Sequence, residues 1–571
     1  MKKRRKLKIK SVLILLVGIG LVLTGIILTK NSSVGNMLEK SSVGYLANSL
    51  YTVDLYEIKK VEDVDVIEKV DSIVRGSEIK YYPDSKKVFD EVEYIKVSYL
   101  DKIYYVLPSN IALSLEEVVL EKELFVRTSY NLLENLDGNL LSLVNKGSRA
   151  DIVGYNKLLD DGSVDLYKVK VGEEEGYFYS KYLVSTLEDA NKHYDEEGLY
   201  QTHLKRVGTL GGGSAGNLDY YPVEKVTFED NKMPEEVYAL YINGAKNIKG
   251  RIDSYIEYAK TTKINAFVVD IKDNCVPAYK SSIYEKLSPT NFKYANNSVE
   301  DYKYAISRLK EEGFYVIGRI TTFKDDYYAL DNKEHAILRK DGSLLKHSGS
   351  YWPSPYNRKV WEFTISLARE AVNLFGFNEI QFDYVRFPDR LNSYEKAGTI
   401  NYGNIYEEEK AQAIQRFLMY AVDELHKLNV YVSADVFGES SWGYVTAYGQ
   451  YWPAISNVVD AISAMPYTDH FDKNKSNWEN PYQTMLNWGK TASSRQGEIK
   501  TPASARTWIT AYDTPYWDPY VTYNGKMLEK QIEGLYDAGL TGGYMTWNSA
   551  GSLAKYKTQF SAFNRNYLQE S

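Results

Sequence analysis

Apolar and polar positions along the C-terminal part of the chain predict strands that alternate with helices. From about residue 235, eight apolar runs have the length of buried strands: Val237–Ile242, Ala266–Ile271, Tyr315–Ile320, Glu379–Tyr384, Val430–Val436, Val459–Ala464, Arg506–Tyr512 and Gly543–Trp547. Amphipathic helical segments lie between them: Ile252–Thr261, Val299–Glu312, Val360–Phe375, Glu407–Leu428 and Lys526–Ala538. Eight strand–helix units over about 320 residues predict an α/β fold, a (β/α)8 TIM barrel.

Between about residues 45 and 185 the pattern changes to short runs rich in Val, Ile and Tyr, separated by Gly, Asp and Asn. Such runs are typical of short strands joined by turns. A repeat of about 71–72 residues aligns Gly76 with Gly147 and Lys96-Val97 with Lys168-Val169. The pattern therefore predicts these parts: two small all-β modules at 45–115 and 116–186, a linker at 187–233 and the barrel domain at 234–562.

The N-terminus has the pattern of a membrane anchor. Residues 1–10 carry seven positive charges and no acid, and residues 11–29 form an uncharged apolar run of 19 residues. As a helix this run would measure roughly 28 Å, close to the thickness of the bilayer core. Basic residues before the span predict a single-pass protein of the cell membrane, with a cytoplasmic N-terminus and extracellular C-terminal domains. The alternative is a cleaved signal peptide, although no A-x-A site follows the run.

Charge and cysteine content exclude several classes of protein. The 571 residues carry 69 basic and 76 acidic side chains, but the first 30 residues hold eight of the basic ones and no acid. The remainder is therefore strongly acidic, which argues against a nucleic-acid partner. The single Cys excludes an intramolecular disulfide and a multi-Cys metal site, and the six His residues show no metal-binding spacing. No cofactor or metal is predicted.

Polar residues gather where the predicted barrel strands end. In a TIM barrel, the chemistry lies at the C-terminal ends of the strands. In chain order the candidates there are Asp270, Lys272, Arg319, Gln381, Asp383, Arg386, Asp435, Glu439, Tyr467, His470, Trp508 and Trp547.

Two carboxylates at neighbouring strand ends, Asp383 and Asp435, suit glycoside hydrolysis. One would protonate the leaving oxygen while the other attacks C1 or activates water. A structural ion pair of Asp383 with Arg319 or Arg386 is the alternative. All nine Trp residues lie between 352 and 547, where they could stack on sugar rings or pack in the core.

Several motifs of the C-terminal domain resemble those of a known family. They include the segments 265–273, 376–388, 433–438 and 545–548, with sequences NAFVVDIKD, GFNEIQFDYVRFP, SADVFG and MTWN. This region is similar to a bacterial family of TIM-barrel glycosyl hydrolases of otherwise undefined function. The resemblance implies glycosidase activity. The chain departs from the family after strand six, where it reads MPYTDH at 465–470.

A chitinase-like mechanism is disfavoured, because Val385 stands where chitinase-type barrels carry their catalytic Glu. We expect Asp383 to be the nucleophile or base and Asp435 the general acid, with Glu439 in reserve for the second role. The expected substrate-binding residues are Asp270, Lys272, Arg319, Gln381, Arg386, Tyr467, His470, Trp508 and Trp547.

The second β module, 116–186, resembles a bacterial SH3 domain in its segments LFVRT at 124–128 and EGYFYSKYL at 175–183. The resemblance implies cell-wall binding, and a spacer role is the alternative. Together the patterns predict a membrane-anchored extracellular glycosidase that acts on a cell-wall or surface polysaccharide, with peptidoglycan favoured. The alternatives are a non-catalytic glycan-binding or scaffold protein that keeps the barrel, and a partner-binding role in an envelope complex.

Overall fold

The computed structural model describes residues 40–208, 211–471, 475–515 and 520–568. The chain divides into two compact units: residues 1–124, 151–170 and 179–181 form one, and residues 125–150, 171–178 and 182–571 form the other. The predicted membrane span at 11–29 lies outside the described residues. No helix within those described ranges is long and apolar enough to cross a bilayer.

The N-terminal region is all β, as its sequence pattern predicts. The first sheet has the strand order β3-β2-β7-β6-β4-β1-β8. The bounds of these strands are β1 (Ser42–Leu46), β2 (Thr52–Val61), β3 (Val64–Val74), β4 (Glu78–Tyr81), β6 (Val92–Tyr99), β7 (Lys102–Val106) and β8 (Ile111–Ala112). A further short strand, β5 (Lys87–Phe89), pairs with β6.

A second sheet repeats this topology in the order β11-β10-β14-β13-β12-β9-β15. Its strands are β9 (Glu123–Val126), β10 (Tyr130–Leu133), β11 (Leu140–Val144), β12 (Arg149–Tyr155), β13 (Leu166–Val171), β14 (Glu174–Tyr179) and β15 (Leu183–Val184). The aligned glycines Gly76 and Gly147 both have a left-handed backbone, with φ of 85° and 81°. This is the conformation that favours glycine at a tight turn. The structure thus confirms the internal repeat.

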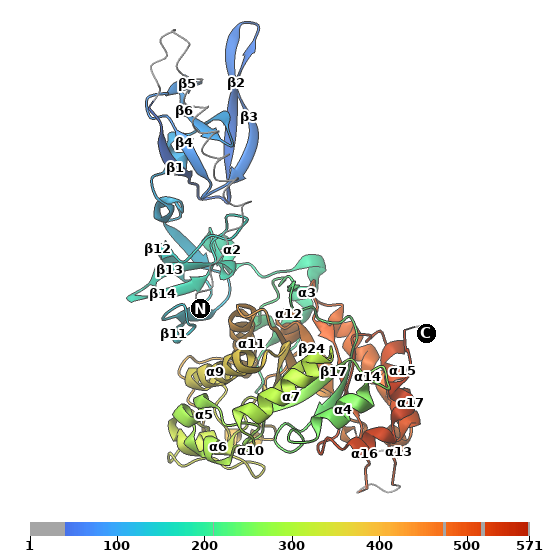
Figure 1. The fold of residues 1–571 in the computed structure, drawn as a ribbon. Helices are drawn as coiled ribbons and strands as arrows, with labels where there is room; N and C mark the ends of the chain where they lie inside the picture. The colour runs from blue at the N-terminus through green and yellow to red at the C-terminus, as the bar shows by residue number, and fades with distance from the viewer. Residues whose placement is uncertain (1–39, 209–210, 472–474, 516–519, 569–571) are drawn as a thin grey trace, which may run out of the picture. The chain divides into compact units, whose positions relative to one another are not determined.

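The C-terminal region forms a nearly closed barrel of parallel strands, drawn from green to red in Figure 1. Its strands are β16 (Val237–Ile242), β17 (Ala266–Asp273), β19 (Tyr315–Thr321), β21 (Glu379–Asp383), β23 (Tyr431–Phe437), β24 (Ala461–Met465), β25 (Ser504–Ala505), β26 (Thr507–Thr510) and β27 (Gly543–Trp547). Each of the eight predicted strands is present. The seventh is interrupted at Arg506, so that β25 pairs with β24 and β26 pairs with β27.

A helix of 5 to 18 residues follows each of the eight strand units of the barrel, with β25 and β26 counted as one unit. These helices are α4 (Ile252–Ala259), α7 (Val299–Glu311), α9 (Arg358–Phe375), α11 (Lys410–His426), α12 (Trp452–Val458), α14 (Pro481–Gln496), α15 (Gly525–Asp537) and α16 (Leu553–Lys557). The five helices predicted from the sequence are among them. Local signals set the bounds of α9, because the Asn357 side chain caps its first turn and Gly376 ends it with φ of 70°.

The second compact unit contains more than the barrel. The hydroxyls of Tyr130 and Tyr182 donate hydrogen bonds of 2.6 and 3.0 Å to the buried carboxylate of Asp423 on α11. On α9, Arg358 donates to the Asn131 side chain over 3.0 Å. These contacts attach residues 125–150 to the barrel helices.

Two charged side chains, Arg506 and Glu379, are buried inside the barrel. Arg506 Nη2 lies 2.7 Å from Glu379 Oε2, and neither side chain is exposed. Glu379 also accepts hydrogen bonds from the hydroxyls of Tyr315 and Ser433. Arg506 therefore provides the positive charge that lets a carboxylate remain inside the core.

Removing that positive charge is expected to destabilise the barrel. Arg506→Met should lower the free energy of unfolding by about 3–5 kcal/mol, because Glu379 would be left as a buried charge without its partner. Urea denaturation measures this change. The double variant Arg506→Met/Glu379→Gln should recover part of the loss, and Arg308→Met, on the surface of α7, is the control. Equal losses in the single and double variants would contradict the explanation.

Candidate functional site

One buried arginine gathers four carboxylates at the C-terminal ends of the barrel strands. Arg319, on β19, is 2% exposed. Its Nη1 lies 2.7 Å from Asp270 Oδ1 and 3.3 Å from Asp273 Oδ1, both on β17. Its Nη2 forms an ion pair with Asp383 Oδ2 on β21, and its Nε lies 3.8 Å from Asp435 Oδ2 on β23. Four acids from three separate strands thus meet at a single cation, and three of them (Asp270, Asp383 and Asp435) are predicted site residues.

Strand register explains why these side chains face one another. In the parallel ladder, Asp270 pairs with Arg319, which pairs with Gln381. Asp383 lies two residues beyond Gln381, so its side chain points to the same inner face of the sheet. The following residue, Tyr384, has a left-handed backbone with φ of 50°, and its N–H donates to Asp383 Oδ1 over 2.6 Å. This turn fixes the orientation of the Asp383 carboxylate.

The acids of the cluster outnumber its single arginine, and two of them have a raised pKa. Burial, reinforced by the charge of Asp383, holds the pKa of Asp435 well above its usual range. Burial also raises the pKa of Asp270 to about 7, although Arg319 opposes the shift. Although burial disfavours its charge, Arg319 has a pKa well above its usual value because of Asp383 and Asp270. The surroundings of Asp435 therefore favour its protonated form, beside an Asp383 that is paired with arginine.

Aromatic side chains complete the surroundings of the carboxylates. Trp508 Nε1 on β26 donates to Asp435 Oδ1 over 2.8 Å. Within the described part of the chain, the other oxygen of Asp435, Oδ2, is buried and has no hydrogen-bond partner. The Trp547 ring lies 5.2 Å from the Arg319 guanidinium and is stacked against Tyr467, with centroids 6.4 Å apart. Trp547 is only partly buried, so its ring is available to a ligand.

Two predicted site residues lie away from this cluster. Lys272 forms an ion pair of 2.8 Å with Asp325, and both side chains are almost completely buried. The register of β17 shifts between Asp270 and Lys272, and this irregularity brings the Lys272 ammonium within 5.7 Å of the Phe363 ring on α9. Gln381 is buried inside the barrel, where its Nε2 donates to Ser463 Oγ over 3.3 Å. Neither residue reaches the carboxylate cluster.

Glu439 and His470 line a separate cavity of about 890 Å³ beyond β21, β23 and β24. Glu439 accepts hydrogen bonds of 2.9 Å from the hydroxyls of both Tyr444 and Tyr448. Arg386 lies behind the cavity wall, with its guanidinium 4.5 Å from the centroid of the Phe437 ring. The exposed Trp442 also lines this space. These residues are placed to contact a ligand that extends from the strand ends.

Sequence reasoning did not assign a role to two members of the cluster. Tyr241 ends β16 and its hydroxyl donates to Asp270 Oδ2. Asp273 follows the irregularity in β17 and joins the Arg319 network. The position of Tyr241 at a strand end was a usable signal, whereas the side-chain direction of Asp273 depends on the shifted register.

No group of three or more His, Cys, Asp or Glu side chains in the described ranges could hold a metal ion. The arrangement offers a carboxyl group with a raised pKa, an arginine-paired carboxylate and an aromatic ring. These are the groups for general acid–base or nucleophilic chemistry beside an apolar ring face.

Comparison with known proteins identifies the family of the barrel. Residues 239–553 match a family described as "Putative glycosyl hydrolase domain". No curated protein matches the chain.

Among solved structures, a hypothetical protein from Ruminiclostridium thermocellum ATCC 27405 is 30% identical, over 34% of this chain and 97% of that one, with a TM-score of 0.30. The glycoside hydrolase domain of PgaB (BpsB) from Bordetella bronchiseptica is 11% identical over 58% and 99%, with a TM-score of 0.39. The spore cortex-lytic enzyme SleL from Bacillus megaterium QM B1551 is 10% identical over 58% and 76%, with a TM-score of 0.35.

The raised pKa of Asp435 implies a specific effect on stability. A carboxyl whose pKa is higher in the folded than in the unfolded state contributes stability at low pH that is lost as the pH rises above about 4. Asp435→Asn should therefore become more stable relative to the unchanged protein as the pH rises. Urea unfolding at about pH 5 and about pH 8 measures the difference.

Asp273→Asn is the matched control, since it makes the same substitution at a partly exposed carboxylate that pairs with Arg319. It should lower stability by removing this ion pair. A stability difference between Asp435→Asn and the unchanged protein that stays constant from about pH 5 to about pH 8 would show that the pKa of Asp435 is not raised in the folded state.

Proposed function

The chain belongs to this glycosyl hydrolase family, and we propose that it is an active glycoside hydrolase in which Asp383 and Asp435 are the two catalytic carboxylates. One observation carries the proposal. A buried carboxyl with a raised pKa, Asp435, lies beside Asp383, which is paired with Arg319. Glycosidases need one carboxyl that holds its proton and one that is charged, and a difference in surroundings creates that difference.

In the proposed reaction, Asp435 donates its proton to the glycosidic oxygen as the C1–O bond breaks. Positive charge develops at C1, and the negative charge of Asp383 stabilises it. Asp383 then either bonds to C1 and is released by water, or removes a proton from a water molecule that attacks C1. The first route retains and the second inverts the anomeric configuration. The configuration of the first product distinguishes them.

The neighbouring aromatic groups support a sugar substrate. The partly exposed Trp547 ring, stacked against Tyr467, presents an apolar face beside Arg319. Pyranose rings pack their C–H faces on such rings. Glu439 and His470 line the adjoining cavity, where further sugar units of a polysaccharide would lie. Glu439 is the reserve candidate for the general acid, if the substrate binds on the side of that cavity.

We further propose that the enzyme acts outside the cell on a cell-wall or surface polysaccharide, with peptidoglycan strands favoured. The apolar run at 11–29 after a basic N-terminus supports a single-pass membrane anchor. The two β modules between 45 and 186 would then lie between membrane and barrel. The SH3-like sequence of the second module supports a role in cell-wall binding.

Activity is tested by incubating the full-length protein with purified peptidoglycan and other envelope polysaccharides and measuring new reducing ends. Asp383→Asn and Asp435→Asn should each lower kcat by about 10²–10⁴-fold, because each removes a group that exchanges a proton or bonds to C1. Asp253→Asn, the same substitution at an exposed carboxylate on α4, is the matched control, and thermal transitions check that each variant is folded.

The alternative, a non-catalytic glycan-binding protein, makes a different prediction for the same experiment. It requires no new reducing ends from any polysaccharide, together with glycan binding that the two Asp→Asn substitutions leave unchanged. That combined result would eliminate the hydrolase, whereas cleavage abolished by either substitution would eliminate the alternative.

The anchor is tested by the location of the protein in cells. The full-length chain should remain with membranes after alkaline extraction, because an apolar span of 19 residues holds it in the bilayer. Protease added to intact protoplasts should degrade the barrel but spare a cytoplasmic marker. A barrel that survives protease until the cells are lysed would contradict the proposed topology.

A further inference from the structure

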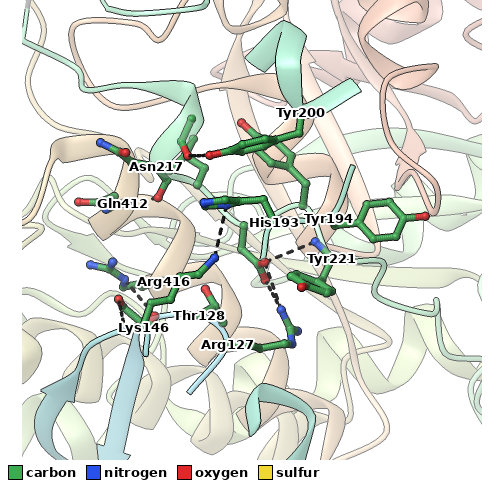
Figure 2. A pocket seen from close by; sticks show the side chains of 15 residues that line it. Arg127, Thr128, Lys146, His193, Tyr194, Tyr200, Asn217, Tyr221, Gln412 and Arg416 are labelled. Carbon is green, nitrogen blue, oxygen red and sulfur yellow. Dashed lines mark hydrogen bonds and ion pairs between the residues drawn. The ribbon is translucent and has the colours of Figure 1, made fainter. Parts of the chain in front are cut away.

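A second cavity lies within the larger compact unit, on a different set of elements from the carboxylate cluster. It has a volume of about 220 Å³. Figure 2 shows its wall, to which Arg127 and Lys146 contribute from turns beside strands of the second β sheet, His193 and Tyr200 from the following segment, and Arg416 from α11. None of these residues takes part in the proposed hydrolysis.

Two of the three Lys and Arg side chains in the wall have a carboxylate partner. Both oxygens of Asp219 lie 3.1 Å from Arg127 Nη1. Arg416 Nη1 lies 2.6 Å from Glu408, which is outside the wall. Each of these two arginines therefore already has an ion-pair partner within the chain.

Lys146 differs from these two arginines in its contacts. Its Nζ donates to the backbone oxygen of Lys192 over 2.7 Å and lies 3.4 Å from His193 Nδ1. No carboxylate forms an ion pair with it among the residues that the structure describes. Burial lowers the pKa of Lys146, and the nearby charge of Arg127 acts in the same direction while Asp219 opposes it. A half-buried ammonium in such surroundings is stabilised by an added anion.

Next to this ammonium, the wall offers an apolar surface and hydroxyl groups. The rings of His193 and Tyr200 are stacked, with centroids 4.2 Å apart and planes at 10°. Thr128 and Ser129, which follow Arg127 in the sequence, also line the cavity. Since a water molecule occupies roughly 30 Å³ of liquid, the space suits a ligand about the size of one or two amino acids.

We propose that this cavity binds the carboxylate group of a small ligand, such as the end of a peptide or a uronic acid. The carboxylate would accept a hydrogen bond from Lys146 Nζ, and the adjoining part of the ligand would lie against the ring wall of His193 and Tyr200. The proposal does not depend on the hydrolase function, because it concerns binding alone at residues outside the carboxylate cluster.

The test compares an acid with its uncharged amide. N-acetyl-alanyl-alanine and N-acetyl-alanyl-alanine amide are titrated separately into the full-length protein in detergent, and binding is followed by ligand-observed NMR. Glucuronate and glucose form the second pair. The acid of at least one pair should bind about tenfold more tightly than its uncharged counterpart, since only the acid pairs with Lys146. Which pair responds identifies the source of the carboxylate.

Lys146→Gln should weaken binding of that acid by about tenfold, whereas Lys146→Arg should retain it. Lys122→Gln, at an exposed lysine of the same region, is the control, and thermal transitions confirm that each variant is folded. If Lys146→Gln fails to fold, the acid–amide comparison and Lys146→Arg still decide the question. Equal binding of acid and uncharged probe, binding unaffected by Lys146→Gln, or binding of inorganic phosphate but neither acid would overturn the proposal.

Discussion

The carboxylate cluster at the C-terminal ends of the barrel strands depends on a single buried positive charge, that of Arg319. Arg319 contacts three carboxylates as ion pairs and lies close to a fourth, that of Asp435. Four ionised acids around one guanidinium in a buried site would be strongly unfavourable. Burial and the charge of Asp383 raise the pKa of Asp435, which has the most distant contact with arginine. The same constraint thus gives neighbouring carboxyl groups different surroundings, as the proposed acid and base require.

The barrel supplies this arrangement through the geometry of its strands. Parallel strands bring their C-terminal ends to one edge, and the two-residue alternation sends Asp270, Asp383 and Asp435 inward. Farther down, the Glu379–Arg506 pair fills the interior with a second charged layer, in which acid and base are balanced. In the lower layer the one acid has one basic partner, as expected of a structural ion pair. In the upper layer acids outnumber the single arginine, as expected of candidate catalytic groups.

Most of the barrel could be predicted from the sequence because its strands are continuous apolar runs and its helices have a clear apolar face. The central pair, Asp383 and Asp435, could be predicted because each ends such a run. The direction of Lys272 could not, because a register shift in β17 changes which side chains face inward. The positions of Glu439 and His470 beside a separate cavity could not be predicted either. Both residues lie beyond the strands, where the sequence has no periodic pattern from which the backbone could be predicted.

The hydrogen bonds of Tyr130 and Tyr182 to the barrel limit where the chain could be cut in a gene fusion. Asp423, on the outside of the barrel, receives its two hydroxyl hydrogen bonds from Tyr130 and Tyr182, which precede the barrel by more than fifty residues. A barrel moved by gene fusion to a new N-terminal partner would leave both tyrosines behind. A fusion that keeps both hydrogen bonds would have to cut the chain before residue 125 rather than at the start of the barrel.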